Sequence, residues 1–569
     1  MPQLPPTPAE FTAATWADVE PHYRALAERP LSADTVADWL AEWSRTESFL
    51  SEAASLAMIA YTQDTGDPAK EAANLRWASE ILPRMEEQSV ALQRRLVALG
   101  VDVPGLETTL RRFRTSIAIF REANVPVVSA LEGLSAEYQK ATGGMLAEWE
   151  GERIPLPRLN PFLKATDRAV RERAWRATTQ PYVDARDTLA MLFDTMLARR
   201  QEVARNAGFA DFEQYVFQAK FRFDYTPADC RRFHAGVERA VIPAVRRLNE
   251  ERRRALGVAT LRPWDTQVDI HGGEPEPPFR DGADLIARSR GVFHDLDAQL
   301  GTWFDTMADE GRLDLDSRKG KAPGGYCDTL AFSGRPFIFM NAAGVFDDVN
   351  TLLHEAGHAF HAFAAHPIPY LWQRHPGSEA AELASMSMEL LAAPHLKGDG
   401  RFFDEEGWVR VRLEHLEDVL GSLAHIASVD CFQSWLYTDG AGADPDARDR
   451  QWLAVRERFE QGIDWSGLER ERTARWYRQL HIFLYPFYYI EYGIAQLGAL
   501  QVWRHSLRDP AEAVRRYRSA LALGATAPLP AIYEAAGARL GFDEALIEEL
   551  VGLVEQEMDR LRAQLPVRA

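Results

Sequence analysis

The chain has 569 residues, of which 46% are hydrophobic and 26% are charged, and its formal net charge at pH 7 is −19. A chain of this length exceeds one ordinary hydrophobic core, so we expect more than one lobe. The negative charge argues against a nucleic-acid partner, because phosphate groups bind clustered Lys and Arg side chains.

The chain also lacks the patterns of a secreted or membrane protein. The first residues, MPQLPPTPAEF, contain no basic segment followed by an apolar run, and no later segment approaches about 18 uncharged apolar residues. The three cysteines, Cys230, Cys327 and Cys431, are far apart and form no C-x-x-C pair, so we expect neither a disulfide framework nor a thiolate metal site. We expect a cytoplasmic protein that does not bind membranes; the sequence does not indicate its oligomeric state.

The first part of the chain is predicted to be helical. Residues 32–65, 68–100 and 125–149 carry apolar residues at steps of three and four, separated by Gly and Pro breaks. Residues 152–157 are too rich in proline for a helix and favour an edge strand or extended segment, whereas residues 167–208 return to helix. We expect residues 1–200 to form an N-terminal helical lobe and residues 201–569 to form the catalytic region.

Two short segments interrupt the helical pattern in the middle of the chain. Residues 271–278 are rich in Gly and Pro and predict a surface loop, and residues 332–341, FSGRPFIFMN, have the aromatic and β-branched character of a strand. A peptide could pair with a free edge of this strand, although a small sheet that serves only the core is the alternative. The basic loop before it lacks the GK[ST] ending of a nucleotide-binding loop.

The next segment contains the pentapeptide His354-Glu355-Ala356-Gly357-His358 within an apolar helical stretch. Histidines four residues apart lie on one face of a helix, so both imidazoles can bind one metal ion. Zinc prefers such ligands, and Glu355 is placed to take a proton from a water at the open position. The alternative is a pair of histidines in the core without metal.

The third metal ligand has several candidates. The metzincin pattern is excluded, because His361 and Ala364 stand where that class requires Gly and His. A glutamate from the next helix is the alternative. We favour Glu382, with Glu379 as the second choice, and expect Glu389 to orient a ligand imidazole and His361 to be a core or supporting residue.

Helices are predicted again from Glu379 to the end of the chain, at residues 379–393, 405–438, 446–462, 466–481 and 486–507, with two more beyond. One segment, residues 481–493, is dense in aromatic groups that can donate hydrogen bonds to a developing oxyanion. We expect His481 and Tyr485 to approach from a loop before a helix that begins at Pro486. Function is predicted for His481, Tyr492 and Tyr489, with Tyr485 as a further candidate, whereas Tyr488 is expected to be a core residue.

Together these motifs resemble the oligoendopeptidase F and thimet oligopeptidase family of zinc metallopeptidases, specifically its bacterial oligoendopeptidase branch. The resemblance is carried by PFIFMN at residues 336–341, HEAGHAFH at 354–361, ELASMSME at 382–389 and the cluster from His481 to Tyr492. It implies His354, His358 and Glu382 as ligands of one zinc ion per chain and Glu355 as general base. Relative to the thimet branch, the gap from His481 to the tyrosines is one residue shorter, which leaves the carbonyl-binding tyrosine open; we favour Tyr492.

The resemblance also implies a mainly α, two-lobed helical clamshell with a small β-sheet next to the zinc-binding helix and a gluzincin-like core. We therefore expect a zinc endopeptidase that hydrolyses short, unstructured peptides. Two alternatives remain: a zinc peptidase directed to a chain terminus, of the dipeptidyl or monocarboxypeptidase type, and a helical peptide-binding scaffold with a vestigial metal site.

Overall fold

The computed structural model describes residues 3–101, 103–270 and 277–565. Contacts between residues divide the chain into two compact units, each built from three segments of sequence. Unit 1 comprises residues 1–118, 276–408 and 498–540, and unit 2 comprises residues 119–275, 409–497 and 541–569. The predicted regions 1–200 and 201–569 are continuous in sequence, whereas these units are not, and that division stays a prediction. The predicted loop at residues 271–278 lies mostly outside the described residues.

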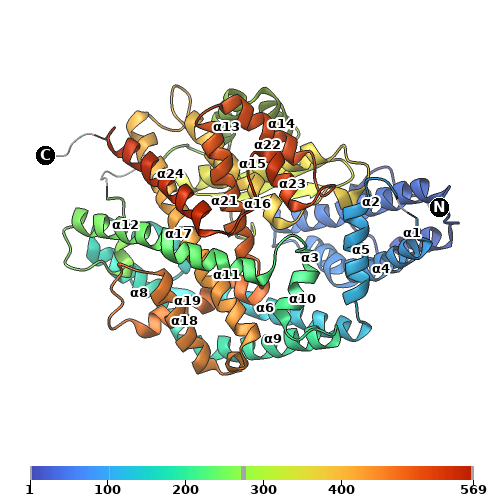
Figure 1. Cartoon of the computed structure of the whole chain (residues 1–569), viewed down its shortest axis with the longest axis horizontal. Helices are drawn as coiled ribbons and strands as arrows, with labels where there is room; N and C mark the ends of the chain where they lie inside the picture. Colours follow the sequence, from blue (N-terminus) through green and yellow to red (C-terminus); the bar gives the residue numbers. More distant parts are fainter. Residues whose placement is uncertain (1–2, 102, 271–276, 566–569) are drawn as a thin grey trace. The chain divides into compact units, whose positions relative to one another are not determined.

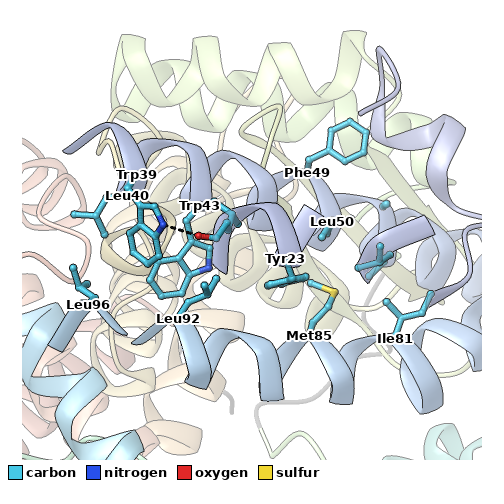
Figure 2. Close-up of a cluster of buried hydrophobic side chains, with 14 of the residues drawn as sticks. Tyr23, Trp39, Leu40, Trp43, Phe49, Leu50, Ile81, Met85, Leu92 and Leu96 are labelled. Carbon is cyan, nitrogen blue, oxygen red and sulfur yellow. Dashed lines mark hydrogen bonds between the residues drawn. The ribbon is translucent and has the colours of Figure 1, made fainter. Parts of the chain in front are cut away.

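Unit 1 begins with a helical bundle (Figure 1). Its helices are α1 (Trp16–Glu28), α2 (Val36–Gln63), α3 (Pro68–Arg76), α4 (Leu82–Leu99) and α5 (Glu107–Ile119). Figure 2 shows the aromatic and aliphatic side chains between these helices, among them Trp39, Trp43 and Tyr23, which are almost fully buried. The predicted helices at 32–65 and 68–100 are confirmed, the second as α3 and α4 joined by a short π-helical segment.

The second segment of unit 1 holds a three-stranded sheet and the helices that cover it. Its elements are α13 (Gly282–Leu296), α14 (Ala298–Asp309), β3 (Leu313–Asp316), β4 (Tyr326–Leu330), β5 (Arg335–Ala342), α15 (Phe346–Ala365) and α16 (Ser378–Ala392). Helix α15 contacts β4 and β5, and it also packs along α16. Helices α22 (Pro510–Leu521) and α23 (Leu529–Ala536) complete the unit and contact α16.

The predicted strand at residues 332–341 is present as β5, but the expectation that its edge is free is wrong. The strand order is β3-β5-β4, so β5 pairs with β3 in parallel and with β4 in antiparallel orientation. Residues 337–340 of β5 are buried, which explains their apolar character: the run marks the centre of the sheet. The edges belong to β3 and β4.

Unit 2 is also mainly helical. Its elements are α6 (Val125–Gly143), β1 (Leu146–Trp149), β2 (Glu152–Pro155), α7 (Asn160–Leu163), α8 (Arg168–Asp184), α9 (Arg186–Asn206), α10 (Phe212–Ala219), α11 (Pro227–Gly236), α12 (Ile242–Ala255), α18 (Pro445–Phe459), α19 (Glu469–Arg478), α20 (Leu480–Leu484) and α24 (Glu544–Arg562). Helices α17 (Glu405–Thr438) and α21 (Tyr489–Ser506) have residues in both units.

The predicted helix at 125–149 is wrong at its end. Helix α6 stops at Gly143, next to Gly144, and residues 146–149 form strand β1 of an antiparallel hairpin with β2. Two successive glycines favour a helix end, and Ala147 and Trp149 alternate inward as a strand requires. The predicted edge strand at 152–157 is confirmed over Glu152–Pro155.

The fold class, mainly α with a small β-sheet next to the helix that carries the H-E-x-x-H pattern, is confirmed. Among the described helices, none combines the length and the apolar character that crossing a membrane requires.

Candidate metal centre and oxyanion-binding groups

Helix α15 carries His354, Glu355 and His358 and begins at a well-defined cap. The Asp348 carboxylate accepts hydrogen bonds from the backbone N–H groups of Ala343, Gly344 and Val345 at 2.8, 2.8 and 3.0 Å. A carboxylate in the first helical turn satisfies free N–H groups and complements the helix dipole. The helix start is therefore fixed about two turns before the first histidine.

Gly357 allows α16 to approach α15 closely. A Cβ atom at this position would lie 2.5 Å from the Ser385 Cα and 2.7 Å from the Ala384 carbonyl oxygen, far inside contact distance. The Tyr517 hydroxyl donates a 2.9 Å hydrogen bond to the same Ala384 carbonyl and so holds α16 from another side. The glycine between the two histidines thus decides how near the glutamates of α16 come to them.

This approach brings three predicted ligands together. The Glu382 Oε2 atom lies 3.2 Å from the His354 Nε2 and 3.6 Å from the His358 Nε2, and one donor atom from each residue lies within 4.8 Å of the others. Tetrahedral zinc ligands about 2.1 Å from one ion are about 3.4 Å from each other. Two imidazoles and a carboxylate at this spacing fit a zinc ion. Glu379, the second choice, is outside this group of donor atoms.

Supporting hydrogen bonds orient the ligand side chains. Glu389 lies 2.7 Å from the His354 Nδ1 through one carboxylate oxygen and accepts a 2.9 Å hydrogen bond from the Asn350 amide through the other. The Ser385 hydroxyl donates to the Glu382 Oε2 at 2.9 Å. With Nδ1 of His354 held by Glu389, Nε2 is the nitrogen available to a metal, as in most histidine metal sites.

The protonation of the histidines follows from their surroundings. Burial lowers the pKa of His358 to about 4, so its imidazole is neutral and has a lone pair to share. Burial acts in the same direction on His354, but hydrogen bonds to Glu382 and Glu389 outweigh it and raise the pKa of His354 well above its usual value. A single positive charge is thus favoured between His354 and two carboxylates, where a divalent cation would replace the proton.

Glu355 is buried and stands apart from the three ligand side chains. Burial raises the pKa of its carboxyl to about 7, although the nearby His354 and a hydrogen bond from the Cys327 backbone N–H act in the opposite direction. Cys327 belongs to β4, an edge strand. The carboxylate predicted to be the general base therefore lies beside the sheet edge, with a pKa suited to accepting and returning a proton.

The predicted oxyanion-binding residues lie together in unit 2. The His481 ring centroid is 4.7 Å from that of Tyr489 and 6.1 Å from that of Tyr492. The predicted helix start at Pro486 is wrong, because α21 begins at Tyr489 and His481 lies in the separate short helix α20. Phe487 causes the break: its backbone is left-handed, with φ at 61°, and its N–H donates to the Gln433 side chain at 2.8 Å.

A chain of hydrogen bonds fixes the proton position on His481. Arg456, which can only donate, lies 3.2 Å from the His425 Nδ1, so His425 carries its proton on Nε2. That nitrogen lies 3.0 Å from the Gln479 Oε1, and the Gln479 Nε2 lies 3.0 Å from the His481 Nδ1. Since the amide nitrogen donates, His481 accepts on Nδ1 and carries its proton on Nε2, which makes it a hydrogen-bond donor to other groups.

Burial and the neighbouring Arg456 lower the pKa of His425 to about 3, consistent with its neutral form. Sequence reasoning missed both Gln479 and His425. The only local signal is the position of Gln479, two residues before His481; His425 is far away in sequence and reaches the cluster through α17.

Comparison with known proteins identifies relatives over much of the chain. Residues 162–277 and 292–552 match peptidase family M3, and residues 7–101 match the peptidase M3 N-terminal domain. The chain is 21% identical over 415 residues to oligopeptidase PepF of Bacillus subtilis (strain 168), a match that covers 71% of this chain and 59% of that protein. It is 22% identical over 378 residues to an oligoendopeptidase F homolog of Lactococcus lactis subsp. lactis (strain IL1403), covering 66% of this chain and 61% of the relative.

These matches therefore span about three fifths of the length of the two relatives. The solved structure of PZ peptidase A with inhibitor 2 is similar over nearly the whole chain. It has a TM-score of 0.87 and 26% identity, with 96% of each chain covered.

Replacing Gly357 by Ala should weaken metal binding, because the new Cβ would push α16 and Glu382 away from the imidazoles. We expect at least a tenfold loss of zinc affinity and a loss of roughly 1–3 kcal/mol in the free energy of unfolding. Equilibrium dialysis followed by metal analysis measures the first quantity. Gly552→Ala is the matched control, since a Cβ at that helical glycine meets nothing within 4 Å. Unchanged zinc affinity in Gly357→Ala would contradict the role of the close approach.

Replacing Glu389 by Gln should reduce zinc affinity about 10–100-fold, because the partner that orients the His354 imidazole loses its charge. Competition with a chromophoric chelator gives the dissociation constant. Glu548→Gln, at an exposed position of α24, serves as the control for loss of one negative charge. If both variants bind zinc as the unmodified protein does, Glu389 does not support the site.

Proposed function

Because the chain belongs to peptidase family M3, we propose that it is a zinc-dependent endopeptidase that hydrolyses short, unstructured peptides. The observation that carries the proposal is the convergence of His354, His358 and Glu382 at tetrahedral spacing. Glu355 lies beside His354 in the sequence of helix α15. A zinc ion held there would supply Lewis acidity that lowers the pKa of water and polarises a peptide carbonyl.

Glu355 performs the proton transfers in this proposal. Its carboxylate accepts a proton from the water that attacks the peptide carbonyl, and it then delivers that proton to the leaving amine nitrogen. The pKa near 7 that burial gives Glu355 suits both steps, because the group must be a base in one and an acid in the next.

His481 and Tyr492, with Tyr489 as a further candidate, stabilise the negative charge that develops on the former carbonyl oxygen. The hydrogen-bond chain from Arg456 supports this role for His481, because it leaves the proton on Nε2 where a donor is needed. Fixed donors directed at developing charge are usually a large part of enzymatic acceleration.

The sheet edge supports an extended peptide as substrate. Strand β4 lies at one edge of the three-stranded sheet, and its Cys327 N–H donates to the proposed base. A peptide that pairs along this edge gains main-chain hydrogen bonds without any demand on its sequence, and its carbonyl groups pass close to Glu355. This edge replaces the free edge of β5 that the sequence predicted.

Glu355→Gln should retain zinc and lose about 10²–10⁴-fold in kcat, because an amide cannot accept the proton of water. Turnover of an internally quenched peptide and zinc content are measured on the same preparation. Near-normal turnover in this variant would remove the proposed base. Glu548→Gln controls for charge and should be unchanged.

A fluorogenic peptide blocked at both ends should be cleaved at an internal bond. A terminus-directed peptidase needs a free α-amino or α-carboxyl group, so it would leave this substrate intact. Mass spectrometry identifies the products, and a chelator should abolish them until zinc is restored. Cleavage only after one end is unblocked would favour the terminus-directed alternative, and no cleavage of any peptide would favour the scaffold.

A further inference from the structure

We propose that a cavity in unit 2, beside His481, binds a carboxylate group of the peptide substrate. The cavity has a volume of about 320 Å³ and is lined by residues that include Trp175, Tyr182, His425, Arg475, Arg478 and Gln479. This volume is at the lower end of small-molecule sites and suits one or two residues of a peptide. The identity of the ligand as a peptide rests on the proposed function, whereas the affinity for a carboxylate does not.

The charges around the cavity favour an anion. Two arginines line it, and no acidic side chain appears among its described lining residues. One of these arginines, Arg475, also donates to the buried Glu460 carboxylate, which accepts further hydrogen bonds from Arg456 and Arg472. One carboxylate thus faces three guanidinium groups, which leaves two positive charges in excess at this place in a chain whose net charge is −19.

The excess positive charge lowers the pKa values of two groups in this cluster, Glu460 and Arg456. Burial would raise the pKa of Glu460, but the three arginines hold it at about 2. Burial and the neighbouring Arg475 and Arg472 lower the pKa of Arg456 to about 10, despite its contact with Glu460. A further anion at the cavity would relieve this repulsion between like charges.

Arg478 is the residue available to bind that anion. It is exposed, and no acidic side chain in the described part of the chain forms an ion pair with it. Its positive charge is close enough to the Tyr182 hydroxyl to lower the pKa of that group against the effect of burial. Guanidinium groups bind carboxylates through two parallel hydrogen bonds, and the indole of Trp175 supplies an apolar wall for the rest of the ligand.

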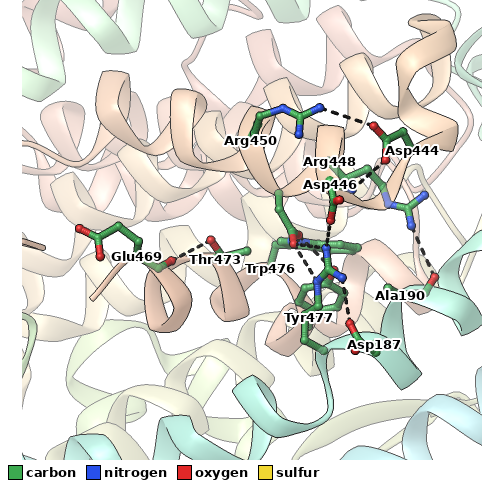
Figure 3. A network of polar contacts seen from close by, with 12 residues as sticks. Asp187, Ala190, Asp444, Asp446, Arg448, Arg450, Glu469, Thr473, Trp476 and Tyr477 are labelled. Atoms are coloured by element: carbon green, nitrogen blue, oxygen red, sulfur yellow. Dashed lines mark hydrogen bonds and ion pairs between the residues drawn. The ribbon is translucent and has the colours of Figure 1, made fainter. Parts of the chain in front are cut away.

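Helix α19, which carries both arginines, is firmly held from its other side. The Trp476 indole and the Tyr477 hydroxyl donate to the Asp449 carboxylate at 2.9 and 3.0 Å, and Arg186 donates to the same group at 2.9 Å. Figure 3 shows Trp476 and Tyr477 within this network of α18 and α19. The two arginines are therefore presented by a fixed helix, which lowers the entropic cost of binding.

Gln479 connects the cavity to the proposed chemistry. It lines the cavity and also donates to the His481 Nδ1, so a ligand in the cavity lies next to the group that stabilises the oxyanion. The bound carboxylate would belong to the peptide substrate. It can be the C-terminal carboxylate of a short peptide or the side chain of Asp or Glu.

Equilibrium binding of dye-labelled peptides to zinc-loaded Glu355→Gln protein tests the proposal without turnover. One pair of peptides has uncharged side chains and differs only at the C-terminus, which is a carboxylate in one peptide and a neutral amide in the other. A second pair is amidated and carries Glu or Gln at each position in turn. We expect about tenfold or tighter binding of the carboxylate form in at least one pair, as charged hydrogen bonds contribute, although the net charge of the protein opposes it. The pair that shows the preference identifies the source of the carboxylate.

Arg478→Gln should abolish the preference and leave the binding of the neutral peptides unchanged, while Arg478→Lys should retain part of it. Arg470→Gln is the matched control, because Arg470 is an exposed arginine of the same helix outside the cavity lining. Equal binding of both forms, or a preference that persists in Arg478→Gln with intact melting behaviour, would overturn the proposal.

The experiments distinguish a failure of the proposed peptidase function from a failure of the proposed carboxylate site. Cleavage of peptides without any preference for a carboxylate would remove the cavity as a binding site and leave the peptidase function in place. A preference that depends on Arg478, in a protein that cleaves no peptide, would support the cavity and remove the proposed reaction.

Discussion

The close packing of α15 against α16 is the constraint on which the candidate centre depends. His354 and His358 are brought to one face by the period of a single helix, but the carboxylate must come from another element. Gly357 gives α16 the space to approach, and Ser385, at the point of contact, also donates to the Glu382 carboxylate. The same few atoms therefore set both the helix packing and the ligand geometry, so that a substitution in one disturbs the other.

The grouping of these side chains in the candidate centre is largely predictable from sequence, because its determinants are local. The spacing of His354 and His358 and the adjacent Glu355 follow from helix periodicity, and Glu382 follows from the next helix after a proline break. Spacing alone does not decide between Glu382 and Glu379, because the two residues are three apart in α16 and project from adjacent parts of its surface. Only the packing of the two helices separates them.

The features that sequence did not predict are those set by tertiary contacts. An apolar run such as residues 337–340 identifies a buried strand but not its position in a sheet, so the central place of β5 was missed. The left-handed backbone of Phe487 is held by a hydrogen bond to Gln433, more than fifty residues away. Because of this contact, α21 begins at Tyr489 and not at Pro486 as the sequence predicts. The proton position on His481 depends on Arg456 through two other side chains, which no local pattern reveals.

The proposed reaction requires that His354, His358 and Glu382 bind one zinc ion. Anomalous diffraction at the zinc absorption edge from crystals of the zinc-loaded protein tests it most directly. We expect one strong peak per chain, about 2.0–2.2 Å from the Nε2 atoms of both histidines and from a Glu382 carboxylate oxygen. A peak at another place, or a Glu382 side chain that points away from the ion, would contradict it.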